Sequence, residues 1–337
     1  MAPLPPAPHA LVDERGAPRF GAFAGRLHDS SLSGLAGRFR RSGLARLAGE
    51  KKWLYACVAS PSLVVAAAVI HLGYAAGAFF YVFDRRERRM LVDRTLKVPA
   101  ALAALDDNPA ESRARLRTAR ARFLIEASRL GGRILVSLPG RVLAEIDLRT
   151  EAAPEPLSAI CPVPGDRVTM TQKASCIPAS GEVRVGPSTF RLQDAWASLD
   201  YSHGLLQRET RWRWASGCGR LEDGRLLGLN LVEGHNDGPV TENALWLDGR
   251  LSGLGRARFE FDPRDPLQAW RVRTEDGAVD LCFDPEGCRR ESFDYGFLAS
   301  RYAQPIGSFR GTVDLPGGER LEVSGLPGVT EDHRSVW

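Results

Sequence analysis

Groups that could bind or protonate a ligand are concentrated in residues 200–248 of this chain. The runs DYSHG, RWRWASG and TENALWLDG place tryptophan, histidine, carboxyl and amide groups between turn signals. Buried Trp and His side chains must bond their N–H groups, and a nearby carboxylate or amide supplies a partner. Aromatic walls with a few polar groups are typical of a small-molecule pocket. The candidate ligand contacts here are Tyr201, Trp212, Trp214, Asn230, Asn243 and Trp246.

Three residues of this stretch are candidate catalytic groups. Asp200 and His203 lie three apart in an expected turn, where the carboxylate could orient the imidazole as a general acid or base. The alternative is an Asp that caps its own turn. Glu242, if buried beside the tryptophans, could donate a proton to an alkene or carbonyl, or could instead form a polar pair with Asn243 that joins two strands. Strand alternation would allow only one of Glu242 and Asn243 to point inward.

Further candidate ligand contacts lie outside this stretch. His71 and Tyr74 could polarise a ligand in the first half, although aromatic residues in strands are usually core. His333, in the run EDHRSVW, could complete a site by docking against the first half, or lie in an exposed terminus. The six cysteines form no CxxC pair, and GxGxxG, P-loop, GxSxG and HExxH motifs are absent from the sequence. We expect neither a metal nor a cofactor.

The composition is that of an ordinary globular protein. Hydrophobic residues make up 44% and charged residues 26%, and the net charge is +4. Arginine dominates, whereas lysine occurs only at positions 51, 52, 97 and 173, and acidic residues nearly balance the basic ones. We therefore expect no nucleic-acid partner. The N-terminal run MAPLPPAPHALVDERG lacks the pattern of a signal peptide, which predicts a cytoplasmic protein with reduced cysteines.

Residues 62–83, SLVVAAAVIHLGYAAGAFFYVF, are apolar enough to span a bilayer. His71 near the middle would be costly in lipid, and the Leu72–Gly73 step can turn the chain between two β-branched and aromatic runs. The sequence favours a β-hairpin. Contact with a membrane stays open as an alternative, but integral insertion is not expected.

Period-two alternation governs most of the chain after residue 133. Examples are Ile134, Val136 and Leu138 before a Pro-Gly turn, then Val142, Ala144, Ile146 and Leu148 after it. Short strands at near-regular spacing predict an all-β fold. Proline and small residues interrupt the pattern at 150–166, which predicts two domains at 1–155 and 166–337. Each could close an antiparallel barrel whose interior is wide enough for one small apolar ligand.

The run AWASLDYSHG followed by RWRWASGCGRLEDGRLLGLNL resembles the lipocalin-like superfamily of hydroxyneurosporene synthase and AttH-like proteins. Together with KKWLYACVASPSLVVAAAVIHLGYAAGAFFYVFDR, GLNLVEGHNDGPVTENALWLDG and GVTEDHRSVW, it is similar to the uncharacterised bacterial family DUF2804 over nearly the whole chain. The resemblance implies two tandem lipocalin-like β-barrels. The superfamily pattern carries over at Trp196, Asp200, Gly204, Trp212 and Trp214. His203 stands where relatives often have a second Trp, which argues against a direct transfer of hydratase activity.

These observations lead to three functional hypotheses. The first is a protein that binds a hydrophobic small molecule, such as a lipid, isoprenoid or polyketide-like compound, in a tryptophan-lined cavity. The second is an enzyme that performs hydration, cyclisation or isomerisation on such a ligand by cofactor-free acid/base chemistry. The third is a membrane-associated interaction protein anchored through residues 62–83.

Overall fold

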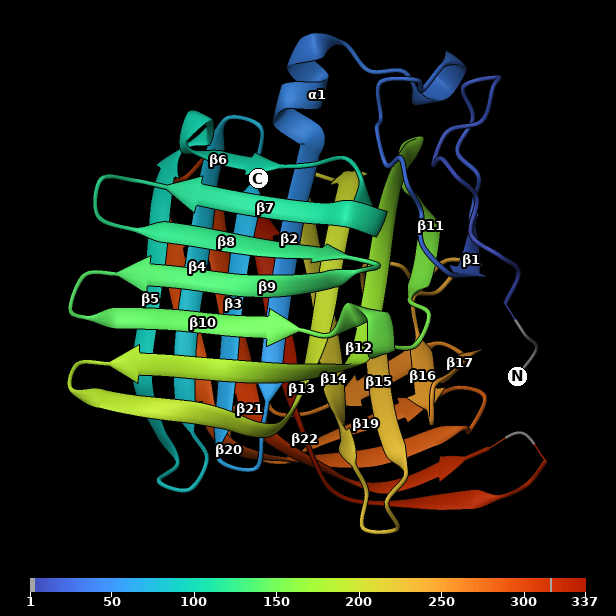
Figure 1. The fold of residues 1–337 in the computed structure, drawn as a ribbon. Coiled ribbons are helices and arrows are strands. Elements are labelled where there is room, and N and C mark those ends of the chain that lie inside the picture. The colour runs from blue at the N-terminus through green and yellow to red at the C-terminus, as the bar shows by residue number, and fades with distance from the viewer. Residues whose placement is uncertain (1–3, 316) are drawn as a thin grey trace.

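The computed structural model describes residues 4–315 and 317–337, and antiparallel strands form most of it (Figure 1). The strands build two curled sheets, each of which nearly closes into a barrel-like half. The predicted all-β fold of two tandem lipocalin-like halves is therefore confirmed.

The first sheet contains residues from 21 to 205, and its main path has the strand order β5-β4-β3-β2-β13-β12-β10-β9-β8-β7-β6. Strand β11 also pairs with β12, and β1 pairs with β11. The strands are β1 (Gly21–Ala24), β2 (Glu50–Ala59), β3 (Leu63–His71), β4 (Ala75–Asp84), β5 (Arg89–Pro99), β6 (Ala103–Leu105), β7 (Ser112–Arg117), β8 (Arg122–Ser128), β9 (Gly131–Leu138), β10 (Val142–Leu148), β11 (Leu157–Val163), β12 (Arg167–Val185) and β13 (Ser188–Leu205). The helical segments are α1 (Gly43–Gly49) and the 3-10 turns η1 (Gly37–Phe39), η2 (Ala100–Leu102), η3 (Pro109–Glu111) and η4 (Thr150–Ala152).

Two long strands fold this sheet into two crossing layers. The first part of β12 pairs with β11, whereas its second part pairs with β10, and the register shifts between Ala174 and Ile177. Cys176 there has φ 58°, a bulge conformation that bends the strand. Figure 1 shows β12 and β13 turning from the layer of β2–β5 into the layer of β6–β10.

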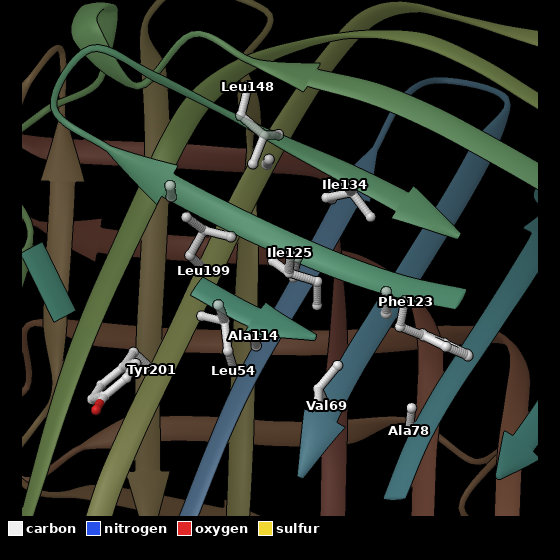
Figure 2. Packing of buried hydrophobic residues seen from close by; sticks show 14 of the residues in the cluster. Leu54, Val69, Ala78, Ala114, Phe123, Ile125, Ile134, Leu148, Leu199 and Tyr201 are labelled. Atoms are coloured by element: carbon white, nitrogen blue, oxygen red, sulfur yellow. The ribbon is translucent and has the colours of Figure 1, made fainter. Parts of the chain in front are cut away.

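Side chains fill the space between these two layers. Leu54, Val69 and Ala78 meet Phe123 and Ile125 from the crossing layer (Figure 2). A cavity that remains inside this half, beside Leu54, has a volume of only about 20 Å³. The expectation of a ligand inside the first barrel is wrong, because large apolar residues occupy its interior.

The second sheet contains residues from 209 to 336 and has the strand order β17-β16-β15-β14-β22-β21-β20-β19-β18. Its strands are β14 (Glu209–Arg220), β15 (Leu226–Glu233), β16 (Ala244–Leu247), β17 (Arg250–Gly253), β18 (Ala257–Glu260), β19 (Trp270–Thr274), β20 (Val279–Asp294), β21 (Ala299–Asp314) and β22 (Arg320–Val336). The interior of this half is a separate core, with Trp270, Phe283 and Phe309 among its largest members.

The apolar run 62–83 forms the predicted hairpin, β3 and β4, with a turn at residues 72–74. Both of its faces are buried. Val65, Val69 and Phe80 point into the first barrel, whereas Ala68 and Tyr81 pack on the second half. Burial on two sides is sufficient to explain the unbroken apolar run. Within the described residues no helix has the length and apolarity needed to cross a bilayer.

The boundary between the two sheets differs from the predicted one. Strand β11 lies inside the proline-rich stretch 150–166, and β12 and β13 follow it, yet all three complete the first sheet. The second sheet begins at Glu209. Residues 150–166 therefore contain the 3-10 turn η4 and strand β11 of the first half, and the chain passes between the halves at 206–208.

Candidate functional site

A cavity of about 320 Å³ lies between the two halves. The outer face of β2–β5 and the adjoining parts of β12 and β13 form one wall, and β14 with the facing ends of β20, β21 and β22 forms the other. Apolar side chains dominate the lining, among them Trp53, Phe79 and Trp214. The site is therefore an inter-sheet cavity, in contrast to the expected barrel interior.

A buried cluster of three charges lies on the cavity wall. Lys173 Nζ is 2.7 Å from Asp200 Oδ2 and 3.0 Å from Glu242 Oε2, and all three side chains are buried. Burial opposes the charge on Lys173, but the two carboxylates outweigh it and raise the pKa of the ammonium group above its ordinary value. Asn236 also donates to Glu242. One cation therefore holds two carboxylates at the edge of an apolar space.

Glu331 forms the second polar centre of the cavity. Trp212 Nε1 donates to its Oε1 at 2.7 Å, and Gln304 Nε2 donates to its Oε2 at 2.9 Å. Both donors are neutral. Burial raises the pKa of Glu331 to about 7, helped by the negative charge of Asp200 and opposed by the hydrogen bonds. This carboxyl group can therefore exist in either protonation state near neutral pH.

Several buried polar atoms on the cavity wall have no hydrogen-bond partner within the described part of the chain. These include the hydroxyls of Tyr55 and Tyr302, His235 Nε2 and His333 Nδ1. Burial lowers the pKa of His333 to about 3, so its ring is neutral at pH 7, and its Nε2 contacts the hydroxyls of Ser300 and Ser335. Buried polar groups nearly always have partners, so free ones that line a cavity indicate a ligand's position.

The structure brings five of the predicted site residues to this cavity. Asp200, Glu242, Trp212, Trp214 and His333 all line it. His333 reaches the site because the C-terminal strand β22 packs against the first half, which is one of the two alternatives that the sequence suggests. Their catalytic and binding roles stay predictions.

The predicted pair of Asp200 and His203 is wrong. Both residues lie within strand β13 and not in a turn, and an odd spacing puts their side chains on opposite faces. Asp200 contacts Lys173, Thr171 and Ser202.

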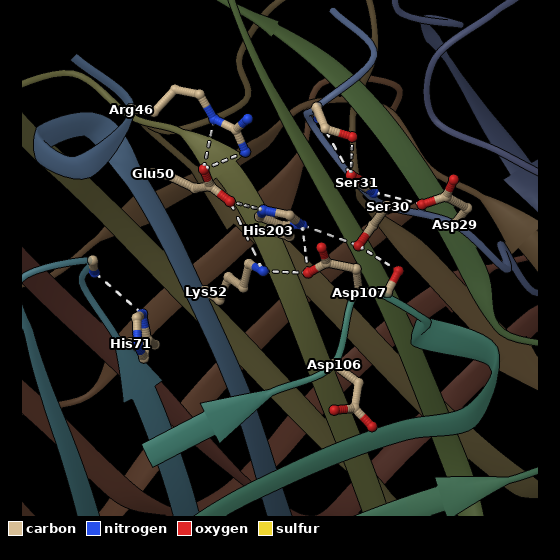
Figure 3. A network of polar contacts seen from close by, with 12 residues as sticks. Asp29, Ser30, Ser31, Arg46, Glu50, Lys52, His71, Asp106, Asp107 and His203 are labelled. Atoms are coloured by element: carbon tan, nitrogen blue, oxygen red, sulfur yellow. Dashed lines mark hydrogen bonds and ion pairs between the residues drawn. The ribbon is translucent and has the colours of Figure 1, made fainter. Parts of the chain in front are cut away.

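His203 points instead into a polar network at the end of the first barrel (Figure 3). Its Nε2 is 2.9 Å from Glu50 Oε1 and its Nδ1 is 3.0 Å from Ser30 Oγ. Ser30 Oγ in turn bonds the hydroxyl of Tyr201 at 2.8 Å. Ser30 and His203 are fully buried, and neither lines the cavity between the halves. Tyr201 and His203 therefore lie outside the site.

Glu242 and Asn243 lie in the loop before β16 and not on a strand, which removes the alternation argument. Both are buried: Glu242 faces the cavity, and Asn243 bonds the backbone of Val232 and Gly255. Asn230 lies behind the wall, where it accepts from Trp214 Nε1 at 2.8 Å. Trp246 packs in a separate core and donates to the carbonyl of Glu155.

His71 and Tyr74 lie near the end of hairpin β3–β4 but outside the cavity lining. His71 Nδ1 accepts from the backbone of Gly73 at 3.2 Å, and the ring of Tyr74 lies 4.8 Å from Lys51 Nζ. Neither contact directs the side chain toward a ligand in the cavity.

Lys173, Arg289 and Tyr302 belong to the site but are absent from the sequence-based candidates. Arg289 is buried, with its guanidinium 4.2 Å from the ring centre of Phe79 and 5.0 Å from that of Tyr302. Of these three residues, only Lys173 stands out in the sequence, because it is one of four lysines in an arginine-rich chain. Lys173 pairs with residues distant in sequence, and Arg289 pairs both with the distant Asp93 and with Glu291 two positions away.

Comparison with known proteins agrees with this architecture. The family described as "Domain of unknown function (DUF2804)" matches residues 6–337. The chain belongs to the DUF2804 family. This confirms the resemblance inferred from the tryptophan-rich centre and the C-terminal run. No curated protein matches the sequence.

Solved structures with a similar fold are distant in sequence. CghA solved with Sch210972 is 13% identical, with a TM-score of 0.56 over 86% of this chain and 88% of that one. Kievitone hydratase from Nectria haematococca is 10% identical, with a TM-score of 0.51 over 93% of this chain and 98% of that one. Identities this low establish a shared fold for this DUF2804 protein and leave its reaction open.

Proposed function

We propose that this DUF2804 protein binds a largely apolar small molecule, of lipid, isoprenoid or polyketide-like type, in the cavity between its two halves. The observation that carries the proposal is an apolar cavity whose buried hydroxyl and imidazole groups lack partners within the described residues. Apolar walls supply the affinity and the polar groups supply orientation. The similarity to CghA, which has been solved with a small molecule, supports the proposal at the level of fold.

A fluorescent apolar probe tests the binding proposal. N-phenyl-1-naphthylamine should bind the wild-type protein with one saturable site and gain fluorescence. Ala68 lines the cavity on β3, so Ala68→Phe should fill part of it and weaken binding at least tenfold. Leu130→Phe adds the same ring at an exposed turn and is the matched control. Unchanged affinity in Ala68→Phe would refute binding at this cavity.

A second candidate function is cofactor-free acid/base chemistry on the bound molecule. Four carboxyl groups line one cavity, and this density of ionisable groups exceeds what orientation alone requires. They belong to Asp200, Glu242, Glu291 and Glu331. The name of kievitone hydratase is consistent with such chemistry on this fold. Replacing Glu242 with Gln should abolish turnover and preserve probe binding if Glu242 is the acid.

We also propose that the protein is cytoplasmic. All six cysteines are free and four of them are buried, which fits a reducing compartment. Fractionation of cells that produce the full chain would test this location.

A further inference from the structure

The four carboxyl groups that line the cavity differ in what surrounds them. Glu291 pairs with two cations, Arg289 and Lys97. Asp200 and Glu242 share the ammonium group of Lys173, and Asp200 also accepts from Thr171 and Ser202. Among the described residues, the side chains that donate to Glu331 or approach it as donors are neutral: Trp212 and Gln304 donate to it, and the Tyr302 hydroxyl lies close by. Among the described residues the one ion-pair contact of Glu331 is His333 Nδ1 at 3.9 Å, and that ring is uncharged at pH 7. Glu331 is therefore the carboxyl group that is free to exchange a proton.

The neighbours of Glu331 on the same sheet face provide a site for an oxygen atom. Tyr302 on β21 and His333 on β22 are register partners, and their rings are 5.1 Å apart. The Tyr302 hydroxyl is buried and has no partner at hydrogen-bond distance in the described residues. It lines the cavity beside Glu331, close enough to lower the pKa of that carboxyl group. Burial raises the pKa of this phenol well above its ordinary value, so it remains a hydrogen-bond donor. A free donor in an apolar cavity selects a ligand with an acceptor oxygen.

We infer that Glu331 moves a proton on and off the carbon next to the carbonyl group of an apolar ketone or aldehyde, while Tyr302 binds the carbonyl oxygen. The inference rests on the proposed binding function and names its substrate class. It also replaces Glu242 with Glu331 as the proton-transfer group.

The proton balance of this step is closed. The Glu331 carboxylate takes the proton from the α-carbon, and the electron pair of the broken C–H bond forms a C=C bond. The π electrons of the carbonyl move to its oxygen, which the Tyr302 hydroxyl stabilises by hydrogen bonding. Return of the same proton to the same carbon restores the ketone unchanged. If the proton on Glu331 exchanges with solvent before it returns, the carbon gains a solvent hydrogen, and return to a conjugated carbon gives isomerisation. The step requires no oxidant, reductant or metal.

Several features of the wall suit this step. Trp212 and Gln304 fix the Glu331 carboxyl group from two sides, and Gln304 is itself held by the Tyr81 hydroxyl at 2.8 Å. The apolar surroundings reduce the amount of water around the reacting groups and so strengthen the hydrogen bonds to the carbonyl oxygen. A carboxyl group with a pKa near the working pH is suited to both removal and return of a proton.

Deuterium exchange into 1-tetralone, an apolar ketone, tests the inference. In D2O, NMR follows the loss of the proton signal at C2 of the ketone. The wild-type protein should accelerate exchange with saturation, and Glu331→Gln should lower the saturated rate at least 100-fold. Glu145→Gln, which changes an exposed carboxyl group on β10, should leave the saturated exchange rate unchanged. Tyr302→Phe should lower the exchange rate about tenfold.

Displacement of N-phenyl-1-naphthylamine by 1-tetralone, measured on the same samples, separates the possible failures. If 1-tetralone displaces the probe but the wild type gives no exchange above buffer, or if Glu331→Gln keeps the wild-type rate, the inference is wrong and the binding proposal stands. If Tyr302→Phe exchanges at the wild-type rate, the assignment of the oxygen site is wrong. If neither compound binds the wild type, the binding proposal itself fails.

Discussion

Trp53 of the first half and Trp212 of the second half stack across the cavity, with ring centres 6.0 Å apart and planes within 11° of parallel. Each indole donates its N–H to a different carboxyl group: Trp53 to Asp200 at 3.4 Å and Trp212 to Glu331 at 2.7 Å. The stack therefore joins the two halves and orients an acidic group on each side. Stacking contributes contact area, and the N–H groups supply direction.

This arrangement predicts that the two tryptophans act on different carboxyl groups. Trp212→Phe should raise the pKa of Glu331 further above its ordinary value, because the lost hydrogen bond favours the ionised form. Trp53→Phe removes an N–H group that points to Asp200, and it should shift the pKa of Glu331 far less. Carboxyl-selective 13C NMR across a pH titration measures both variants. Equal shifts in the two would contradict the assigned partners.

The raised pKa of Glu331 also predicts a pH dependence of stability. The folded state holds the proton up to about pH 7, whereas the unfolded chain loses it near the ordinary value of 4.5. The folded state binds more protons in this window, so its free energy of unfolding falls as pH rises from about 4.5 to above 7. The loss is on the order of 3 kcal/mol.

Urea unfolding at several pH values tests this dependence. The wild-type protein should lose stability relative to Glu331→Gln as the pH increases through this window. His333 has a lowered pKa and acts with the opposite sign between about pH 3 and 6.5, but it is present in both proteins and cancels in the difference. A difference that is constant with pH would show that Glu331 titrates normally.

The stability of the buried cluster around Lys173 should depend on the positive charge of this lysine. Lys173→Met leaves two buried carboxylates without a counter-charge and should lower the free energy of unfolding by about 3–5 kcal/mol. Adding Asp200→Asn and Glu242→Gln removes both charges and should recover much of that loss. Lys97→Met, at a half-exposed ion pair, is the control and should cost less than about 1 kcal/mol. A triple variant less stable than Lys173→Met would contradict this account.

Close packing between the halves is tested at Gly287. A Cβ atom at this position would lie 2.3 Å from the ring of Phe83 in the first half, so Gly287→Ala should destabilise the protein by about 1–3 kcal/mol. Gly43→Ala adds a methyl group in open space at the start of α1 and should not destabilise. Thermal unfolding compares the two. Equal melting temperatures would mean that the halves do not pack as described.

Much of the fold follows from the sequence, because period two and turn residues are local signals. Hairpin 62–83 is the clearest case: the Leu72–Gly73 step and the β-branched runs identify two strands. The way in which the strands assemble depends on contacts between residues distant in sequence, which local signals do not predict. Alternation cannot distinguish a residue that points into a barrel, such as Val69, from one that points into the contact between barrels, such as Ala68, since both are apolar and buried.

The site was predictable by residue type and only partly by position. Trp212, Trp214, Asp200, Glu242 and His333 do meet at one cavity. The pairing of Asp200 with His203 failed because a strand, not a turn, separates their side chains. The ion pairs of Lys173 form with residues 27 and 69 positions away, and a single sequence carries no signal for contacts at such separations.

A crystal structure of the protein with N-phenyl-1-naphthylamine tests the central claim most directly. The account predicts one molecule between the halves, in contact with Trp53, Trp214 and Tyr302. A molecule inside either barrel, or in the outer groove beside Arg38 and Arg211, would contradict the assignment of the ligand site to the cavity between the two halves.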